Sequence, residues 1–291
     1  MRNQGIERKV LAVLGMLLAV LSGCVPQPSL QPLYTEDTVV FEPALVGTWS
    51  TESGEETVVI EAGEENSYRL IYIVDDKFHE GVSVYEVHAV RVGDRLYLDL
   101  VPDDSYYDPL FEENAYLPMI PAHFFCQVEL RDDALYLAQV DDDWVKKQIR
   151  ENRVTLPHAV YDNDEIVLTA TPEELQEFLK NNPTGQTPGD GDALHRIPDE
   201  VGQVRAARVF AERNREDLAE AAYTRAVEIN PHYGEAYQEL GNLRATQGRH
   251  REALAAYLKA AEFISDDAEL RQRIAATYET IARESFCGTT P

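Results

Sequence analysis

The segment Ala-Glu-Ala-Ala-Tyr-Thr-Arg-Ala at positions 219–226 returns further along the chain as Ala-Leu-Ala-Ala-Tyr-Leu-Lys-Ala at positions 253–260. In both copies a small residue, a tyrosine and a second small residue stand at positions i, i+4 and i+7. These positions lie on one face of an α-helix. A repeat of this length indicates helical hairpins that stack on one another. The C-terminal part of the chain is therefore predicted to be an all-α array.

The residues around the two copies extend the pattern. Tyr237 and the pair Leu240-Gly241 precede the second copy, and Pro231 ends the first unit. This order is similar to the tetratricopeptide repeat, whose small residues let two helices approach while aromatic residues fill the space to the next unit. The resemblance covers about residues 200–286. It departs from the family at Ser265, where a proline is usual, and at Arg244, where a tyrosine is frequent.

The resemblance implies a protein–protein interaction through a groove lined by the first helix of each unit. Polar residues on those helices are the candidate contacts to a partner, and arginines on an otherwise acidic chain suit an acidic segment. The candidate groove residues are Arg205, Arg208, Asn242 and Arg244.

Residues 40–182 have the pattern of antiparallel β structure. Runs of β-branched and aromatic residues alternate with short polar turns such as Gly93-Asp94, as hairpins prefer. The predicted strands are 45–51, 56–62, 67–74, 82–92, 95–101, 123–130, 134–140, 154–161 and 165–171. This order favours an up-and-down barrel or a strongly curled sheet. Helices are expected at 141–150 and, behind a capping box, at 171–181.

The first of these strands contains Val46-Gly47-Thr48-Trp49, which resembles the Gly-x-Trp opening of lipocalin-like barrels. In that family the glycine allows a close approach and the tryptophan plugs the closed end. The resemblance implies a lipocalin-like β domain, and a hydrophobic small molecule inside it is one function that such a barrel allows. Bulky residues at inward positions favour a barrel filled by its own side chains. These residues are Trp49, Tyr72, Phe124 and Leu137.

The first residues have the features of an export signal. A basic start is followed by an apolar run from Val10 to Leu21, which is shorter than the about 20 residues that span a bilayer. The next residues, Leu21-Ser22-Gly23-Cys24, resemble a bacterial lipobox, in which the cysteine takes a diacylglycerol and becomes the acylated first residue. The resemblance implies a signal peptide at 1–23, lipidation of Cys24, and attachment to the cell envelope. A plain secreted protein and an uncleaved anchor are the alternatives.

Val25 stands where some bacteria place an aspartate for inner-membrane retention, so we expect the outer membrane, facing the periplasm. Pro26, Pro28 and Pro32 predict an extended, lipidated tether at 24–39 that would hold the first domain about 35 Å from the bilayer. A second Gly/Pro-rich segment, 183–199, is the predicted linker between the domains. Residues 287–291 are the predicted tail.

Charge excludes some partners. The net charge is −26. Residues 25–180 carry 10 basic and 33 acidic residues and therefore account for −23 of it. A negative field repels phosphate backbones and anionic headgroups, which argues against nucleic acid as a partner and against the body lying flat on a membrane. Attachment is therefore expected to come from the lipid, with the body held away from the bilayer.

The sequence contains no convincing catalytic, cofactor or metal motif, and an enzyme is the least favoured class. Glu86 and His88 project from one face of a strand, most simply as an ordinary polar pair. Cys126 has the pattern of a small buried hydrophobe, and Cys287 is either a free thiol or an intermolecular partner. Acidic pairs such as Asp132-Asp133 lack calcium-site spacing.

The segment 102–121 is long for a link between two strands and carries aromatic residues among acids. It is either a lid or contact surface at the barrel mouth, or a cover over a barrel seam. Its candidate residues are Tyr106, Tyr107, Phe111 and Tyr116. The preferred function is a lipid-anchored adaptor that binds protein through its helical groove, and the alternative is a carrier of a hydrophobic ligand.

Overall fold

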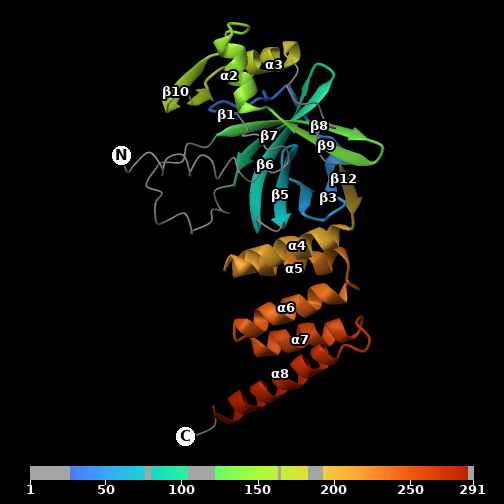
Figure 1. Cartoon of the computed structure of the whole chain (residues 1–291). Helices are drawn as coiled ribbons and strands as arrows, with labels where there is room; N and C mark the ends of the chain where they lie inside the picture. Colours follow the sequence, from blue (N-terminus) through green and yellow to red (C-terminus); the bar gives the residue numbers. More distant parts are fainter. Residues whose placement is uncertain (1–26, 76–79, 104–121, 163–164, 183–192, 288–291) are drawn as a thin grey trace. The chain divides into compact units, whose positions relative to one another are not determined.

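The computed structural model describes residues 27–75, 80–103, 122–162, 165–182 and 193–287. The chain folds as two units, Met1–Ile197 and Pro198–Pro291, which Figure 1 colours from blue to yellow and from yellow to red. The signal peptide, Cys24 and the four aromatic lid candidates, Tyr106, Tyr107, Phe111 and Tyr116, lie outside the described residues. Within the described residues, no helix has the length and hydropathy of a membrane span.

The first unit is built on an eight-stranded antiparallel barrel. Seven of its strands follow one another in sequence and pair as neighbours, and the eighth, β12, lies between β9 and β3. A further pairing of β8 with β9 completes the circle. The barrel strands are β3 (Gly47–Ser50), β4 (Glu56–Ala62), β5 (Ser67–Asp75), β6 (Glu80–Val92), β7 (Arg95–Pro102), β8 (His123–Arg131), β9 (Ala134–Gln139) and β12 (Leu194–Ile197).

The predicted strand order is correct from β3 to β9 and wrong after β9. The last two predicted strands, found as β10 (His158–Asp162) and β11 (Glu165–Leu168), are not barrel strands. They form a hairpin that joins the barrel sheet through β1 (Pro28–Ser29), which pairs with both β11 and β8. Strand β12 belongs to the predicted linker, the segment 183–199. With four residues, of which only Leu194 is buried, β12 is too short to show the alternation of apolar and polar residues that marks a strand.

One cluster of side chains fills the inside of the barrel. It includes Trp49, Tyr72 and Leu135, each 2 % exposed or less, and Leu137 packs against it. A surface hollow of about 410 Å³ is lined mostly by charged and polar groups, among them Glu42, Arg91, Asp94, Arg95 and Glu129. The cluster inside the barrel agrees with the expectation of a barrel filled by its own side chains.

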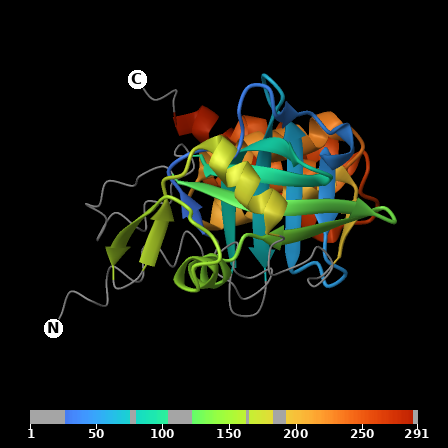
Figure 2. The ribbon, with the colours of Figure 1, turned by 90° about the horizontal axis from the view of Figure 1, so that it is seen from above.

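A second core lies on the outer face of the barrel, under α2 (Asp142–Arg150) and α3 (Pro172–Asn181). Both views show these helices and the hairpin β10–β11 on the same side of the barrel (Figures 1 and 2). The predicted capping box of α3 is confirmed, because Thr171 Oγ1 accepts from Glu174 N and Glu174 Oε2 accepts from Thr171 N. The face of α3 that packs on the outer core is apolar, and its buried residues are Leu175, Phe178 and Leu179.

The predicted tether at 24–39 is wrong for the part that the structure describes. Residues 27–35, which we call the strap, pack against the barrel and its outer core, and Leu33 in it is fully buried. The short strand β2 (Val39–Val40) pairs with β6, and the 3₁₀ turn η1 (Pro43–Leu45) leads into β3. Proline in the strap suits a short edge strand as well as a free extended chain, so composition alone does not distinguish them.

The second unit consists of helices arranged as the repeat predicts. They are α4 (Asp199–Glu212), α5 (Glu216–Ile229), α6 (Gly234–Thr246), α7 (His250–Ala261) and α8 (Ala268–Cys287). The repeated small and aromatic residues of α5 and α7, Ala219, Tyr223, Ala226, Ala253, Tyr257 and Ala260, are all buried. A Cβ at Gly241 would lie 2.6 Å from the ring of Tyr257, so α6 and α7 approach as closely as the predicted glycine allows.

Candidate protein-interaction surface

A line of polar side chains joins α4, α6 and α8, the first helix of each successive unit. Arg208 Nη2 on α4 donates to Glu239 Oε1 on α6 at 3.2 Å. The amide of Asn242 donates to the other oxygen of Glu239, also at 3.2 Å. Arg273 on α8 donates to Asn242 Oδ1 and, at 2.6 Å, to Glu269 Oε1. We call these five residues the ladder.

Helical spacing explains why α6 stands at the centre of the ladder. Glu235, Glu239 and Asn242 occupy positions i, i+4 and i+7 and therefore share one face of α6. Glu235 accepts a second bond from Arg208 at 2.5 Å. The hydroxyl of Tyr257 donates to Asn242 Oδ1 at 2.9 Å, so the amide is held from α7 as well as from α8. Burial raises the pKa of this tyrosine, which keeps the hydroxyl a donor at neutral pH.

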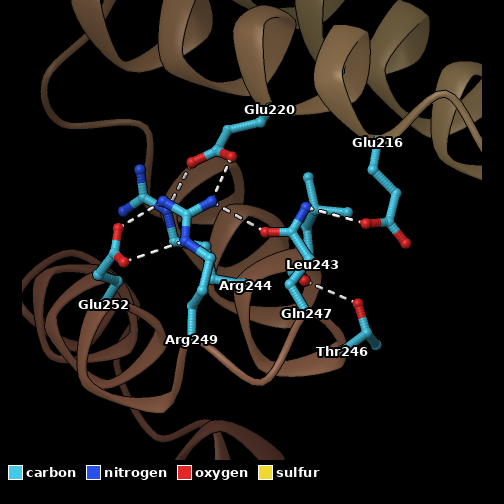
Figure 3. Close-up of polar contacts among 8 residues, drawn as sticks. All are labelled: Glu216, Glu220, Leu243, Arg244, Thr246, Gln247, Arg249 and Glu252. Atoms are coloured by element: carbon cyan, nitrogen blue, oxygen red, sulfur yellow. Dashed lines mark hydrogen bonds and ion pairs between the residues drawn. The ribbon is translucent and has the colours of Figure 1, made fainter.

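A second cluster fastens α5 to the turn between α6 and α7 (Figure 3). Glu220 on α5 accepts from Arg244 Nε at 3.0 Å and from Arg249 Nη1 at 2.5 Å. Arg249 also donates to Glu252 at the start of α7, and Gln247 donates to Glu216 at 3.1 Å. The bond from Arg249 lowers the pKa of Glu220, and burial opposes it only in part. We call this cluster the repeat junction.

The four predicted groove residues do not form one site. Arg208 and Asn242 belong to the ladder, whereas Arg244 belongs to the repeat junction. Arg205 lies half-buried on α4 and has a polar contact of its own. The arginines expected to receive an acidic partner are thus already bonded within the chain, and such a partner would have to compete with these acids.

Arg273 and Glu239 are ladder residues that the sequence analysis did not select, although the repeat contains a signal for them. Arg205, Glu239 and Arg273 are spaced by the same interval as the two copies of the repeat, so they occupy the same position in successive units. The charge at this position alternates from basic to acidic to basic. An alternation of this kind favours attraction between neighbouring first helices. The ladder bonds run from Arg208 to Glu239 and from Arg273 to Asn242, so the register indicates the helix face but not the bonding partners.

Among the described residues of the barrel unit, Asp99 is a buried charged group whose surroundings could suggest chemistry. Asp99, which is fully buried, accepts from the backbone N–H of Leu33 at 2.7 Å, and its other oxygen lies 2.7 Å from His123 Nδ1. His88 stacks on Tyr34 of the strap with the ring centres 4.2 Å apart. Within the described residues, no group of three or more His, Cys, Asp or Glu side chains could hold a metal ion. These contacts fasten the strap to the barrel.

Comparison with known families agrees with the geometry of the second unit. Residues 234–267 match the tetratricopeptide repeat. The match begins at the first residue of α6 and includes all of α7. No curated protein matches the chain significantly. A tetratricopeptide repeat suggests protein–protein interaction, and its first-helix face is the one that carries the ladder.

Proposed function

We propose that this protein is a lipid-anchored adaptor of the bacterial cell envelope that binds a partner protein through its tetratricopeptide region. The observation that carries the proposal is the match at 234–267, on a helical pair whose first-helix face carries the ladder. The lipobox-like Leu21-Ser22-Gly23-Cys24 supports the anchor, and Val25 supports the outer membrane, facing the periplasm.

The finer proposal is that the partner presents an acidic segment. Arg208 retains 44 % of its side-chain exposure although it contacts two glutamates. An exposed ion pair is easily replaced by another, because each such pair stabilises the fold by only about 0.2–1 kcal/mol. Carboxylates of a partner could therefore replace Glu235 and Glu239 on Arg208.

Site-specific photocrosslinking in intact envelopes tests the adaptor. Photoreactive residues are placed at Gln238 on α6 and at Gln272 on α8, both next to the ladder. Matched controls are Ala221 and Ala255, exposed and equivalent positions of successive units on the second helices α5 and α7. We expect one discrete adduct from the first pair and none from the controls. No adduct, or equal adducts at all four positions, would contradict a partner bound to the first-helix face.

The acidic partner has its own test once the adduct is identified by mass spectrometry. Arg208→Gln should weaken the affinity for that partner several-fold, whereas Glu235→Gln should strengthen it by removing a competing carboxylate. If Arg208→Gln strengthened the affinity and Glu235→Gln weakened it, the partner would instead present basic groups.

A further inference from the structure

The strap is built into the first unit along its whole length. Its first described residue, Gln27, donates its backbone N–H to Val140 O at 2.9 Å. Leu30 donates to Leu168 O at 2.9 Å, and Leu33 donates to Asp99. These acceptors lie ahead of α2, at the end of β11 and within β7. The strap therefore has hydrogen-bond partners in two strands of the barrel unit and in the link between β9 and α2.

Burial shows that these contacts are part of the core. Gln27, Ser29 and Leu33 are each 0 % exposed. Gln176 on α3 donates to Leu33 O at 2.8 Å and so holds the strap from the helical side. Releasing it would expose Leu33 and leave the Asp99 carboxylate without its amide donor, which is costly for a buried charge. The buried residues of the strap are thus part of the packed interior of the barrel unit.

The length of chain outside the strap is short. Only Val25 and Pro26 lie between Cys24 and Gln27. A chain spans at most about 3.6 Å per residue, so the Cα of Cys24 lies within about 11 Å of the Cα of Gln27. A diacylglycerol on that cysteine therefore leaves no room for a gap between the barrel and the bilayer as wide as the predicted tether would allow.

The surface beside Gln27 can be identified. Gln27 Nε2 donates to Ile166 O on β11 at 3.1 Å, and Ile166 pairs with Val160 on β10. Val160 is 63 % exposed, the most exposed of the large hydrophobic side chains described. Two strand spacings, about 10 Å, separate it from the strap. Figure 1 shows β1 of the strap and β10 on the same side of the barrel.

We propose that the barrel is seated on the bilayer by the hairpin β10–β11, with Val160 facing the lipid headgroups. The inference rests on the proposed lipidation of Cys24. The partner is a zwitterionic surface, because Lys146, a cation that contacts the hairpin, is taken up by Asp142 at 2.5 Å and by Glu165. That cation is therefore not available to anionic headgroups, and the acidic barrel repels them.

The test uses the full chain, lipidated in a bacterial host and reconstituted in phosphatidylcholine vesicles that contain a spin-labelled quencher lipid. A fluorophore is placed at Val160→Cys, with Cys287→Ser to remove the thiol near the C-terminus. Ser53→Cys, in the exposed turn between β3 and β4, is the matched control. Each is also made with a long Gly/Ser insertion between Val25 and Pro26. We expect quenching at position 160 to exceed that at 53 several-fold and to fall to the control level with the insertion.

The outcomes separate this inference from the proposed anchor. Intact mass shows whether Cys24 carries the lipid. A protein without the added lipid mass that stays off the vesicles overturns the anchor and this inference with it. A lipidated, vesicle-bound protein with no quenching at position 160 overturns the seating alone. Equal quenching with and without the insertion also overturns it, because contact would then not depend on the short connection to the strap.

Discussion

The guanidinium of Arg196 lies 4.3 Å above the ring of Trp49, joining the last strand of the barrel to the first. Its two terminal nitrogens donate to Val46 O and Ala44 O, both at 2.9 Å, in the 3₁₀ turn that leads into β3. Gly47 makes room for this arrangement. Arg196 therefore links the last barrel strand to the first at the Gly-x-Trp segment, where Gly47 leaves space for its guanidinium.

Gly47→Ala is expected to destabilise the barrel by about 2–4 kcal/mol. The φ of Gly47 is +137°, and a Cβ there would lie 2.1 Å from Arg196 Nη1. Arg196 could move aside only by giving up its carbonyl partners. Urea unfolding followed by tryptophan fluorescence measures the loss, because both tryptophans lie in the barrel unit. The control is Gly93→Ala, where φ is +64° and the nearest atom is 3.9 Å away, with an expected cost of about 1 kcal/mol. Equal losses would show that contact with Arg196 is unimportant.

Arg196→Lys should cost about 1–2 kcal/mol although it keeps the charge. A lysine ammonium is a single point and does not reproduce the planar fork that reaches two carbonyls while stacking on Trp49. Arg91→Lys is the control, since Arg91 lies 3.8 Å from Glu42 and is 49 % exposed, and we expect less than about 0.5 kcal/mol there. The same unfolding assay applies. A lysine that is tolerated at 196 would mean that charge alone maintains the closure.

Glu220→Gln is expected to destabilise the helical unit by about 1 kcal/mol at pH 7. Arg249 lowers the pKa of Glu220 from its ordinary value of 4.5. The stabilisation is therefore complete above pH 4.5 and is lost as the pH falls through the lower, folded-state pKa. Urea unfolding of wild type, followed by circular dichroism at a series of pH values, should show this acid-dependent loss, and the variant should show less of it.

The control for that variant is Glu228→Gln on the same helix. The side chain of Glu228 is 60 % exposed and lies 3.3 Å from Arg225. Removing this exposed carboxylate charge should change the free energy of unfolding by less than about 0.5 kcal/mol. If both variants lose the same stability, the repeat junction contributes nothing beyond an exposed ion pair.

Asp99→Ala should loosen the strap. The carboxylate is fully buried and holds the amide of Leu33, and its loss leaves that donor without a partner at a cost of about 1–3 kcal/mol. Hydrogen exchange at the Leu33 amide is expected to accelerate by about tenfold or more, since each 1.4 kcal/mol is a factor of ten. His123→Ala is the control, because it removes the other partner of Asp99 and spares the bond to Leu33. Unchanged exchange at Leu33 in Asp99→Ala would show that the strap is held elsewhere.

Much of the fold was predictable where the signal is local. The strand run of β7, the turn at Gly93 and the capping box at Thr171 each depend on residues a few positions apart. The helical unit was predictable for a related reason, since its contacts recur from one unit to the next and the register of the repeat shows them. The individual partners of Arg208 and Arg244 were missed because neither pairing follows from composition.

The sequence by itself determined the elements, the two-part organisation and the repeat, because hydrophobic period and capping act within one or two turns of the chain. Only the tertiary structure decided that β12 closes the barrel, that the strap is buried, and that the groove arginines are already paired. Arg196 meets Val46 across 150 positions and Leu33 meets Asp99 across 66. Contacts over such separations depend on how packed elements meet in space, and a segment of ordinary linker or tether composition does not reveal that it has a partner there.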